Sequence, residues 1–253
     1  MGGFKMEKAD CLKHRKSSVV IAVQRPDGSP VSKREVEIRQ TGHSFLFGCG
    51  AFETLNITDS DSGPGKRAFY EERMEKWLKL FNYATLPFYW GQFEASEGNT
   101  NTEAVRRAAL WLKERGVILK GHPLCWHTQT APWLLELTNQ DILEKQLARI
   151  RREVTEFKGL IDMWDVINEV VIMPVFDKYD NGITRICKEL GRVQLVSEVV
   201  GEARRSNPGA VLLLNDFNTS PKYEELIEAC LEAGVSIDAI ASASGILGKR
   251  KAS

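Results

Sequence analysis

The chain has 253 residues, 43% of them hydrophobic and 27% charged, with 34 Lys and Arg residues against 34 Asp and Glu residues. This composition is typical of a globular protein and excludes a disordered chain. The zero net charge provides no general attraction for nucleic acid or an acidic membrane. No segment reaches the roughly 18 apolar residues of a membrane span, and the N-terminus lacks the apolar core of a signal peptide. We therefore expect one large domain without nucleic-acid or membrane partners, which as written would stay in the cytoplasm.

The five cysteines are odd in number and widely scattered, and none has the spacing of a metal site. Cys49, Cys125 and Cys230 stand among apolar residues and are predicted to pack as small hydrophobic side chains. The cysteines thus point to neither a metal nor a cofactor.

Apolar periodicity divides the chain into an N-terminal hairpin and a longer alternation of strands and helices. Residues 18–24 and 35–41 alternate as strands and are joined by the turn-forming stretch 26–30. An apolar strand at 45–52 and a polar loop at 54–65 follow. Later strands are predicted at 81–86, 117–121, 161–167, 211–214 and 237–241, and helices at 66–80, 102–115, 139–157, 183–205 and 221–233. The resulting divisions are 1–43 for an arm and hairpin, 44–241 for the main domain and 242–253 for a tail.

This alternation predicts an α/β fold with a parallel sheet and crossover helices, for which both a doubly wound sheet and an eight-stranded barrel remain possible. No glycine-rich phosphate-binding motif follows a strand, which removes the main nucleotide-binding options. Polar residues instead follow several different strands, as in a (β/α)8 TIM-type barrel. Only residues 242–253 follow the sixth strand, too few for two more units, so we expect an incomplete barrel of about six of the eight βα units.

Candidate functional residues gather after the strands. Glu169 follows the strand 161–167, where an α/β barrel keeps its chemistry, although an acid there could also simply begin the next helix. The segment 121–134 contains two His, two Trp and a Gln. Trp faces and polar edges suit a sugar ring, but the same side chains could be core anchors. His122 and His127 lack a third ligand, so no metal is expected.

Two further clusters occupy the same expected edge of the sheet. The stretch 88–94 combines aromatic residues with Glu94, and the strand 211–214 runs into Asn215, Asp216 and Asn218. Because ligands bind at the carboxyl ends of barrel strands, four such clusters together favour a binding or catalytic site over independent packing roles.

Three motifs resemble glycoside hydrolase family 10, the endo-1,4-β-xylanases, which are retaining enzymes with a (β/α)8 barrel. They are GHPLCWHTQTAPWL at 121–134, WDVINEVV at 164–171 and LLLNDFNT at 212–219. The resemblance covers roughly residues 18–240 and implies that Glu169 is the general acid/base. It also implies a β-1,4-linked polysaccharide, xylan, as substrate, no cofactor, and sugar contacts from Asn168, His122, Trp126, His127, Gln129 and Asn215, with a supporting role for Asp216.

The sequence departs from the family pattern at two places. The stretch 87–92 lacks the family's substrate-binding Asn and Lys, and no TELD-like motif provides the family's nucleophilic Glu. A retaining glycosidase needs two carboxyl groups about 5–5.5 Å apart. We therefore expect this 253-residue chain to be inactive as a xylanase. A non-catalytic glycan-binding protein and a truncated gene product remain as alternatives.

Overall fold

The computed structural model describes residues 18–39, 41, 42 and 44–242. Contacts divide the chain into two compact units, Met1–Ser44 and Phe45–Ser253, and each is described by itself. The predicted tail lies outside the described residues except for its first residue, and so do Cys11 and the first 17 residues of the predicted arm.

In the first unit the predicted turn is present, but the predicted hairpin strands 18–24 and 35–41 are wrong. The chain reverses at residues 25–29, where the Arg25 N–H donates to the Ser29 carbonyl at 2.8 Å, and Gly28 adopts a φ of 81°. Only an isolated bridge between Gln24 and Pro30 accompanies this reversal among the described residues. A two-stranded ribbon is marginal without a surface to pack on, and Val20 is 95% exposed.

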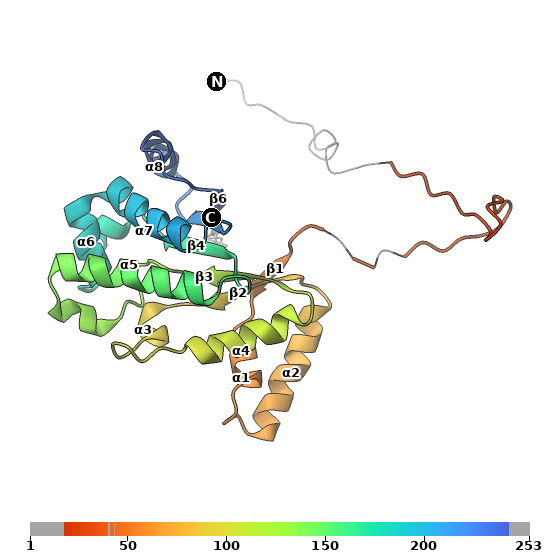
Figure 1. Ribbon diagram of the computed structural model, residues 1–253, viewed down its shortest axis with the longest axis horizontal. Helices are drawn as coiled ribbons and strands as arrows, with labels where there is room; N and C mark the ends of the chain where they lie inside the picture. The colour runs from red at the N-terminus through yellow and green to blue at the C-terminus, as the bar shows by residue number, and fades with distance from the viewer. Residues whose placement is uncertain (1–17, 40, 43, 243–253) are drawn as a thin grey trace, which may run out of the picture. The chain divides into compact units, whose positions relative to one another are not determined.

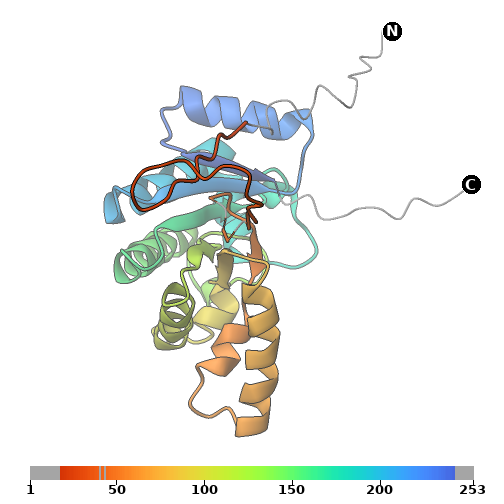
Figure 2. The same cartoon turned by 90° about the vertical axis from the view of Figure 1, so that its right-hand side faces the viewer.

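The second unit is a six-stranded, wholly parallel sheet with the strand order β1-β2-β3-β4-β5-β6. A doubly wound sheet would reverse its order at a switch point, whereas a barrel adds each strand beside the last. The strands curl into part of a barrel with the helices outside, so the prediction of an incomplete TIM-type barrel is confirmed (Figure 1, Figure 2). The strands are β1 Gly48–Gly50, β2 Tyr83–Pro87, β3 Ile118–His122, β4 Met163–Asn168, β5 Val211–Asp216 and β6 Ala239–Ser242.

The helices largely follow the predicted ranges. The α-helices are α1 Glu53–Ile57, α2 Pro64–Leu78, α3 Trp90–Phe93, α4 Thr102–Lys113, α5 Asn139–Glu156, α6 Gly182–Leu190, α7 Arg192–Ser206 and α8 Pro221–Glu232; the 3-10 helices are η2 Pro132–Glu136 and η3 Met173–Val175. Gly116 and Gly159, which follow the C-terminal ends of α4 and α5, adopt φ values of 74° and 79°. This left-handed conformation favours glycine at a helix end.

Two predictions about helical segments are wrong. The loop predicted at 54–65 contains most of α1, and the single helix predicted at 183–205 is two helices, α6 and α7. The break falls at Gly191, whose φ of 82° is incompatible with a continuous right-handed helix. A glycine within an otherwise periodic pattern was the available signal for this break.

A buried aromatic cluster fixes the middle of the sheet. The ring of Phe88 lies 4.9 Å from that of Trp164 and 5.1 Å from that of Phe157 between centroids, and all three side chains are fully buried. A Cβ atom at Gly121 would come within 2.2 Å of the Trp164 ring, so only glycine permits this approach of β3 to β4. Burial of each aromatic side chain contributes roughly 1.5–3 kcal/mol.

The burial of the cysteines agrees only partly with the prediction made from the sequence. Cys125 and Cys230 are buried as expected, and Cys187 is buried too. Cys49 is exposed, and its sulfur accepts a 3.1 Å hydrogen bond from the Trp77 indole. It lies on β1, which is an edge of the described sheet, so that its apolar sequence neighbours do not enclose it.

Candidate functional site

The candidate site forms where β3, β4 and β5 end. The Asn168 N–H donates to the Cys125 carbonyl at 2.9 Å, and the Glu169 N–H donates to the Asn215 carbonyl at 2.8 Å. A register shift between Asp165 and Ile167 precedes this point in β4. Such a shift re-aims the following side chains, and here it aligns Asn168 with Asn215 on β5.

Glu169 has a left-handed backbone, with a φ of 58°. It lies one residue beyond β4 and 13 residues before α6, so that it does not begin the next α-helix. Among the described non-glycine residues only Lys33, Gln129 and Glu169 have a positive φ. Such strained residues cluster at functional sites, and two of these three are candidate site residues.

The carboxyl group of Glu169 is held by the segment after β3. The Trp126 indole N–H donates to Oε2 at 2.9 Å, and Nε2 of His127 lies 3.9 Å from the same oxygen. Burial raises the pKa of Glu169, the nearby negative charge of Asp216 raises it further, and the Trp126 hydrogen bond partly opposes the rise. Glu169 therefore retains its proton to higher pH than an exposed glutamate.

The two histidines have different environments. Burial lowers the pKa of His127 to about 4, so that its ring is neutral at physiological pH and its approach to Glu169 is not an ion pair. His122 places its Nδ1 atom 2.7 Å from Oδ2 of Asp165, which is fully buried. A carboxylate only accepts hydrogen bonds, so Nδ1 donates and the other ring nitrogen of His122 remains available.

Asp165 and Lys120 are two further polar residues of the site. The Lys120 ammonium lies 2.7 Å from the Asp165 oxygen that also binds His122. Sequence reasoning did not single out either residue. The sequence did contain a signal for both residues, because each is a charged residue inside a predicted apolar strand, and such a residue is buried only when it has partners.

An amide pair and a buried acid support the end of β5. The Asn215 amide donates to the Asn168 side-chain oxygen at 2.8 Å. Asp216 is 1% exposed, and its two oxygens accept the N–H groups of Val171 at 3.0 Å and Asn218 at 2.9 Å. These contacts order the loops that follow β4 and β5.

Gln129 does not join the contacts around Glu169. Its side-chain oxygen accepts a 2.7 Å hydrogen bond from Gln92, and its carbonyl accepts the Gly91 N–H at 2.7 Å. The Tyr89 ring lies 5.7 Å from both the His122 and the Trp126 rings between centroids. The predicted residues His122, Trp126, His127, Asn168, Glu169 and Asn215 thus lie together, whereas Gln129 borders the segment that carries Tyr89 and Gln92.

Glu94, the acid of the second aromatic cluster, has a structural environment. It is 2% exposed, its oxygens accept the Trp90 indole N–H at 3.0 Å and pair with Arg152 at 2.6 Å, and its pKa is lowered despite burial by the bonds from Arg152 and Gly98. Its carbonyl also accepts the Trp133 indole N–H at 3.1 Å. Glu94 therefore stabilises α3 and its surroundings.

Replacing Glu169 by glutamine should stabilise the protein at neutral pH by about 1 kcal/mol, as is common when a strained functional group is removed. The raised pKa means that the folded state resists ionisation of Glu169. Wild-type stability therefore falls as pH rises from the unfolded pKa, roughly 4, through the folded one. Urea denaturation at pH 7 and pH 4 checks this.

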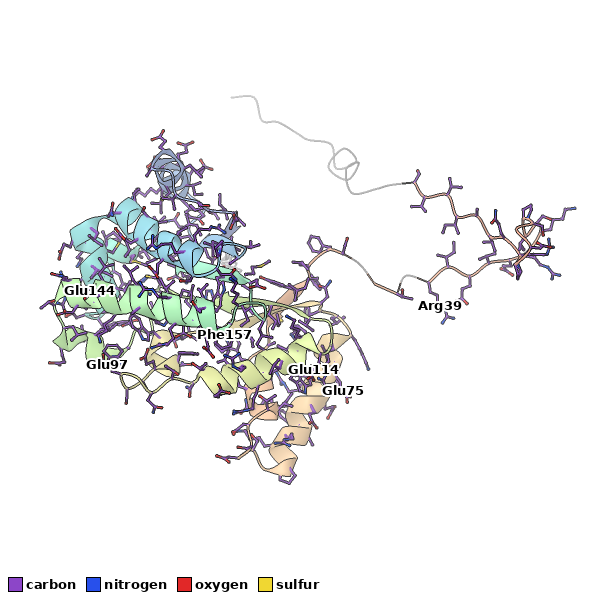
Figure 3. All side chains as sticks on the ribbon, viewed as in Figure 1. Arg39, Glu75, Glu97, Glu114, Glu144 and Phe157 are labelled. Carbon is purple, nitrogen blue, oxygen red and sulfur yellow. The ribbon has the colours of Figure 1, made fainter. Side chains whose placement is uncertain are left out.

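Most of the gain should disappear at pH 4, where the wild-type carboxyl group is largely protonated in the folded state and about half protonated in the unfolded state. The matched control is Glu75→Gln on α2, an exposed glutamate that should change stability little at either pH (Figure 3). A gain at pH 4 equal to that at pH 7 would contradict the role of ionisation.

The sequence matches the family model of glycosyl hydrolase family 10 over residues 79–250. It is 27% identical to endo-1,4-beta-xylanase 3 of Hypocrea jecorina over 167 residues, which are 63% of this chain and 47% of that protein. It is 27% identical to endo-1,4-beta-xylanase 5 of Arabidopsis thaliana over 210 residues, 82% of this chain and 33% of that protein. The chain thus spans a third to a half of the length of these relatives.

Solved structures agree with the fold. A GH10 structure from Paenibacillus barcinonensis superposes with a TM-score of 0.63 at 22% identity, covering 78% of this chain and 59% of the other. Xylanase 10B of Thermotoga petrophila, solved in complex with xylobiose, gives a TM-score of 0.61 at 22% identity, covering 76% and 58%. With the motif matches at the ends of β3, β4 and β5, the family match over two thirds of the sequence establishes that this chain belongs to glycosyl hydrolase family 10.

Proposed function

We propose that the cluster around Glu169 is the acid/base half of an endo-1,4-β-xylanase site that hydrolyses internal bonds of xylan with retention. The observation that carries the proposal is the half-buried Glu169 carboxyl group, bonded to the Trp126 indole at the end of β4 and with its pKa raised by burial. A general acid must be protonated near the working pH and must touch the leaving-group oxygen. The raised pKa brings Glu169 closer to the first condition than an exposed glutamate, and its 21% exposed side chain is accessible to a bound glycan.

The neighbouring side chains suit a neutral sugar. Trp126 and Tyr89 offer aromatic faces, while His122, Asn168 and Asn215 offer hydrogen-bonding groups. Aromatic faces and polar edges match the apolar ring faces and hydroxyl groups of a sugar. We assign these residues, with His127, to the sugar next to the scissile bond, and assign Gln129 to the rim beside Gln92.

Hydrolysis with retention divides the chemistry between two carboxyl groups. Glu169 donates its proton to the glycosidic oxygen while the nucleophile attacks the anomeric carbon, and it then removes a proton from the water that releases the sugar. Asp165 and Asp216, the other carboxylates of the described cluster, are buried and already hold hydrogen bonds. We therefore propose that the nucleophile is not among the described residues and that this 253-residue polypeptide binds xylan without cutting it.

Calorimetric titration of the 253-residue polypeptide with xylotetraose tests the binding function. Saturable heat is expected, with a dissociation constant in the roughly micromolar to millimolar range. Maltotetraose, whose α-1,4 linkages curve the chain, should give no saturable heat and serves as the control ligand. Absence of saturable heat from xylotetraose, with the folded state verified by circular dichroism, would overturn the proposal.

Among the helices of the described residues, none combines the length and the apolar character that a membrane-spanning helix requires.

A further inference from the structure

The loop 169–171 follows β4 and carries Glu169, whose left-handed backbone persists only where the surrounding contacts enforce it. From the side of β5, the Asn215 carbonyl accepts the Glu169 N–H at 2.8 Å. Oδ2 of Asp216 accepts the Val171 N–H at 3.0 Å. Because both bonds to β5 use N–H groups of the loop, its buried carbonyl groups need donors from another element.

Arg192, the first residue of α7, provides those donors. Its Nε atom donates to the Val170 carbonyl at 3.3 Å and to the Val171 carbonyl at 3.1 Å, and its Nη2 atom donates to the Val171 carbonyl at 2.8 Å. Val170 and Val171 are both buried. A guanidinium presents its donors in a fixed planar fork, so this contact sets the orientation of the two peptide groups as well as their position.

The stability of α7 alone does not account for an arginine at this position. The first turn of α7 contains no acidic residue, and it begins with the positive charge of Arg192. A helix N-terminus carries a partial positive charge, so a cation there is unfavourable for the helix. The bonds to the loop 169–171 explain the placement that the helix itself disfavours.

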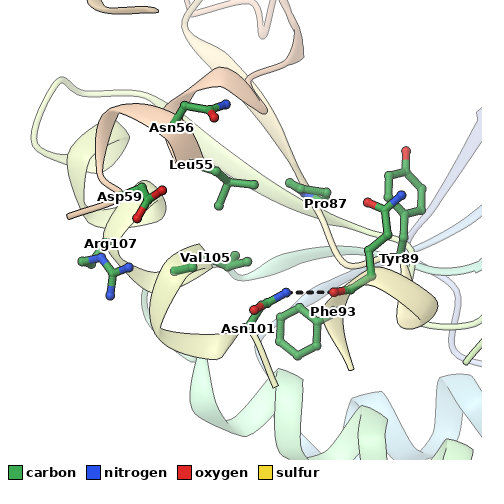
Figure 4. Close-up of a pocket in the computed structure, with 11 residues that line it drawn as sticks. Leu55, Asn56, Asp59, Pro87, Tyr89, Phe93, Asn101, Val105 and Arg107 are labelled. Carbon is green, nitrogen blue, oxygen red and sulfur yellow. Dashed lines mark hydrogen bonds between the residues drawn. The ribbon is translucent and has the colours of Figure 1, made fainter. Parts of the chain in front are cut away.

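Close packing does not hold the loop on this side. A cavity of about 480 Å³ is lined by Val171, Arg192 and Leu226, and atoms that border a void lose contacts there. The cavity of about 340 Å³ between α1 and α4 is different, because none of the described residues that line it comes from the loop 169–171 (Figure 4). Beside Val171, hydrogen bonds therefore do what close packing does not.

We propose that Arg192 is the positioning residue for Glu169. Its guanidinium holds the carbonyl groups of the next two loop residues and so keeps Glu169 in the left-handed conformation that places its carboxyl group against the Trp126 indole. Arg192 acts through the backbone of the loop, since its bonds are to carbonyl groups. The inference deepens the proposed function and rests on it only for the acid/base role of Glu169.

A pH titration of the Glu169 carboxyl carbon by NMR, assigned with Glu169→Gln, tests this role. Arg192→Met removes the donors that hold the loop, so the carboxyl group becomes less buried. Its pKa should fall toward that of an exposed glutamate, because burial is the main cause of its rise and outweighs the lost Trp126 hydrogen bond. The Trp126 indole N–H signal should shift too. A folded Arg192→Met protein with the wild-type Glu169 pKa and Trp126 signal would overturn the proposal.

Arg204 is the matched control, because it lies on the same helix and also donates to backbone carbonyl groups. Its Nη1 atom donates to the carbonyls of Pro208 at 3.1 Å and Ala210 at 2.7 Å, which precede β5 at the opposite end from the site. Arg204→Met should lower the free energy of unfolding but leave the Glu169 pKa unchanged. Equal shifts of this pKa in Arg204→Met and Arg192→Met would mean that general destabilisation is the cause.

Arg192→Lys separates the charge of Arg192 from its contact with two carbonyl groups. Lysine keeps the positive charge but offers one ammonium group in place of the planar fork. The Glu169 pKa should still fall below the wild-type value, and an unchanged value would contradict the role of the fork. If Arg192→Met does not fold, Arg192→Lys and Arg204→Lys provide the same comparison. The titration needs no sugar, so failure of xylotetraose binding overturns the proposed function without deciding the role of Arg192.

Discussion

Replacing Arg149 by methionine is expected to lower the free energy of unfolding by about 3–5 kcal/mol, the usual cost of removing one partner of a buried charge network. The Arg149 side chain projects from α5 and donates to the carbonyl oxygens of Phe88 and Leu124. Phe88 lies just beyond β2 and directly before Tyr89. Leu124 lies just beyond β3 and two positions before Trp126. A single buried guanidinium thus joins the two segments that form one side of the candidate site.

The cost arises because methionine leaves buried polar groups without partners. Arg149 is 2% exposed, and burial lowers its pKa to about 10 while the charge of Glu153 opposes that shift. Without Arg149, the Phe88 carbonyl loses its guanidinium donor and the 1% exposed Glu153 loses a neighbouring positive charge. An unpaired buried polar group costs its full desolvation penalty.

Urea denaturation provides the measurement, with Arg151→Met as the matched control. Arg151 lies on the same helix and pairs with Glu202 at 2.7 Å, but its side chain is 64% exposed. Exposed ion pairs contribute at most about 1 kcal/mol. Equal losses from the two substitutions would contradict the role given to Arg149.

Replacing Trp126 by alanine should weaken xylotetraose binding roughly 30-fold, equivalent to about 2 kcal/mol for a central aromatic contact. Trp126 offers its ring to the sugar and its indole N–H to Glu169. Trp126→Phe separates these roles, because it keeps an aromatic face but removes the donor. We expect a smaller affinity loss for phenylalanine and a further rise in the pKa of Glu169, since the indole hydrogen bond favours the ionised carboxylate.

Calorimetry with the folded variants measures these affinities. Trp111→Ala is the control, because Trp111 lies on α4, where its ring stacks against the Arg115 guanidinium at 3.7 Å. Its removal should leave xylotetraose binding unchanged. If Trp126→Ala bound xylotetraose as wild type does, the sugar could not lie against the Trp126 ring.

The strand ends were the most predictable part of the molecule. Short apolar strands separated by amphipathic helices specify a parallel sheet, and such a sheet gathers the residues that follow its strands. This is why Glu169, Trp126 and Asn215 could be grouped although up to 89 positions separate them in the chain. The geometry among them could not be predicted, because it depends on the register shift in β4 and on the left-handed backbone at Glu169.

Long-range polar contacts were the least predictable part. The links from Lys120 to Asp165 and from Arg149 to two loop carbonyls join residues on different elements, and no local pattern indicates such pairs. The hairpin prediction failed for a related reason. Alternation in residues 18–24 and 35–41 indicates strands only if an apolar face is buried, and Val19 and Ile38 are 77% and 68% exposed.

Release of reducing ends from xylan by the purified 253-residue polypeptide shows whether Glu169 is one carboxyl group of a catalytic pair whose partner lies outside the described residues. In that case sugar binding persists without hydrolysis. Wild type and Glu169→Gln are compared at equal concentration, after calorimetry has verified that both bind xylotetraose. No release above the Glu169→Gln background is expected. Robust release by wild type that disappears in Glu169→Gln would contradict it.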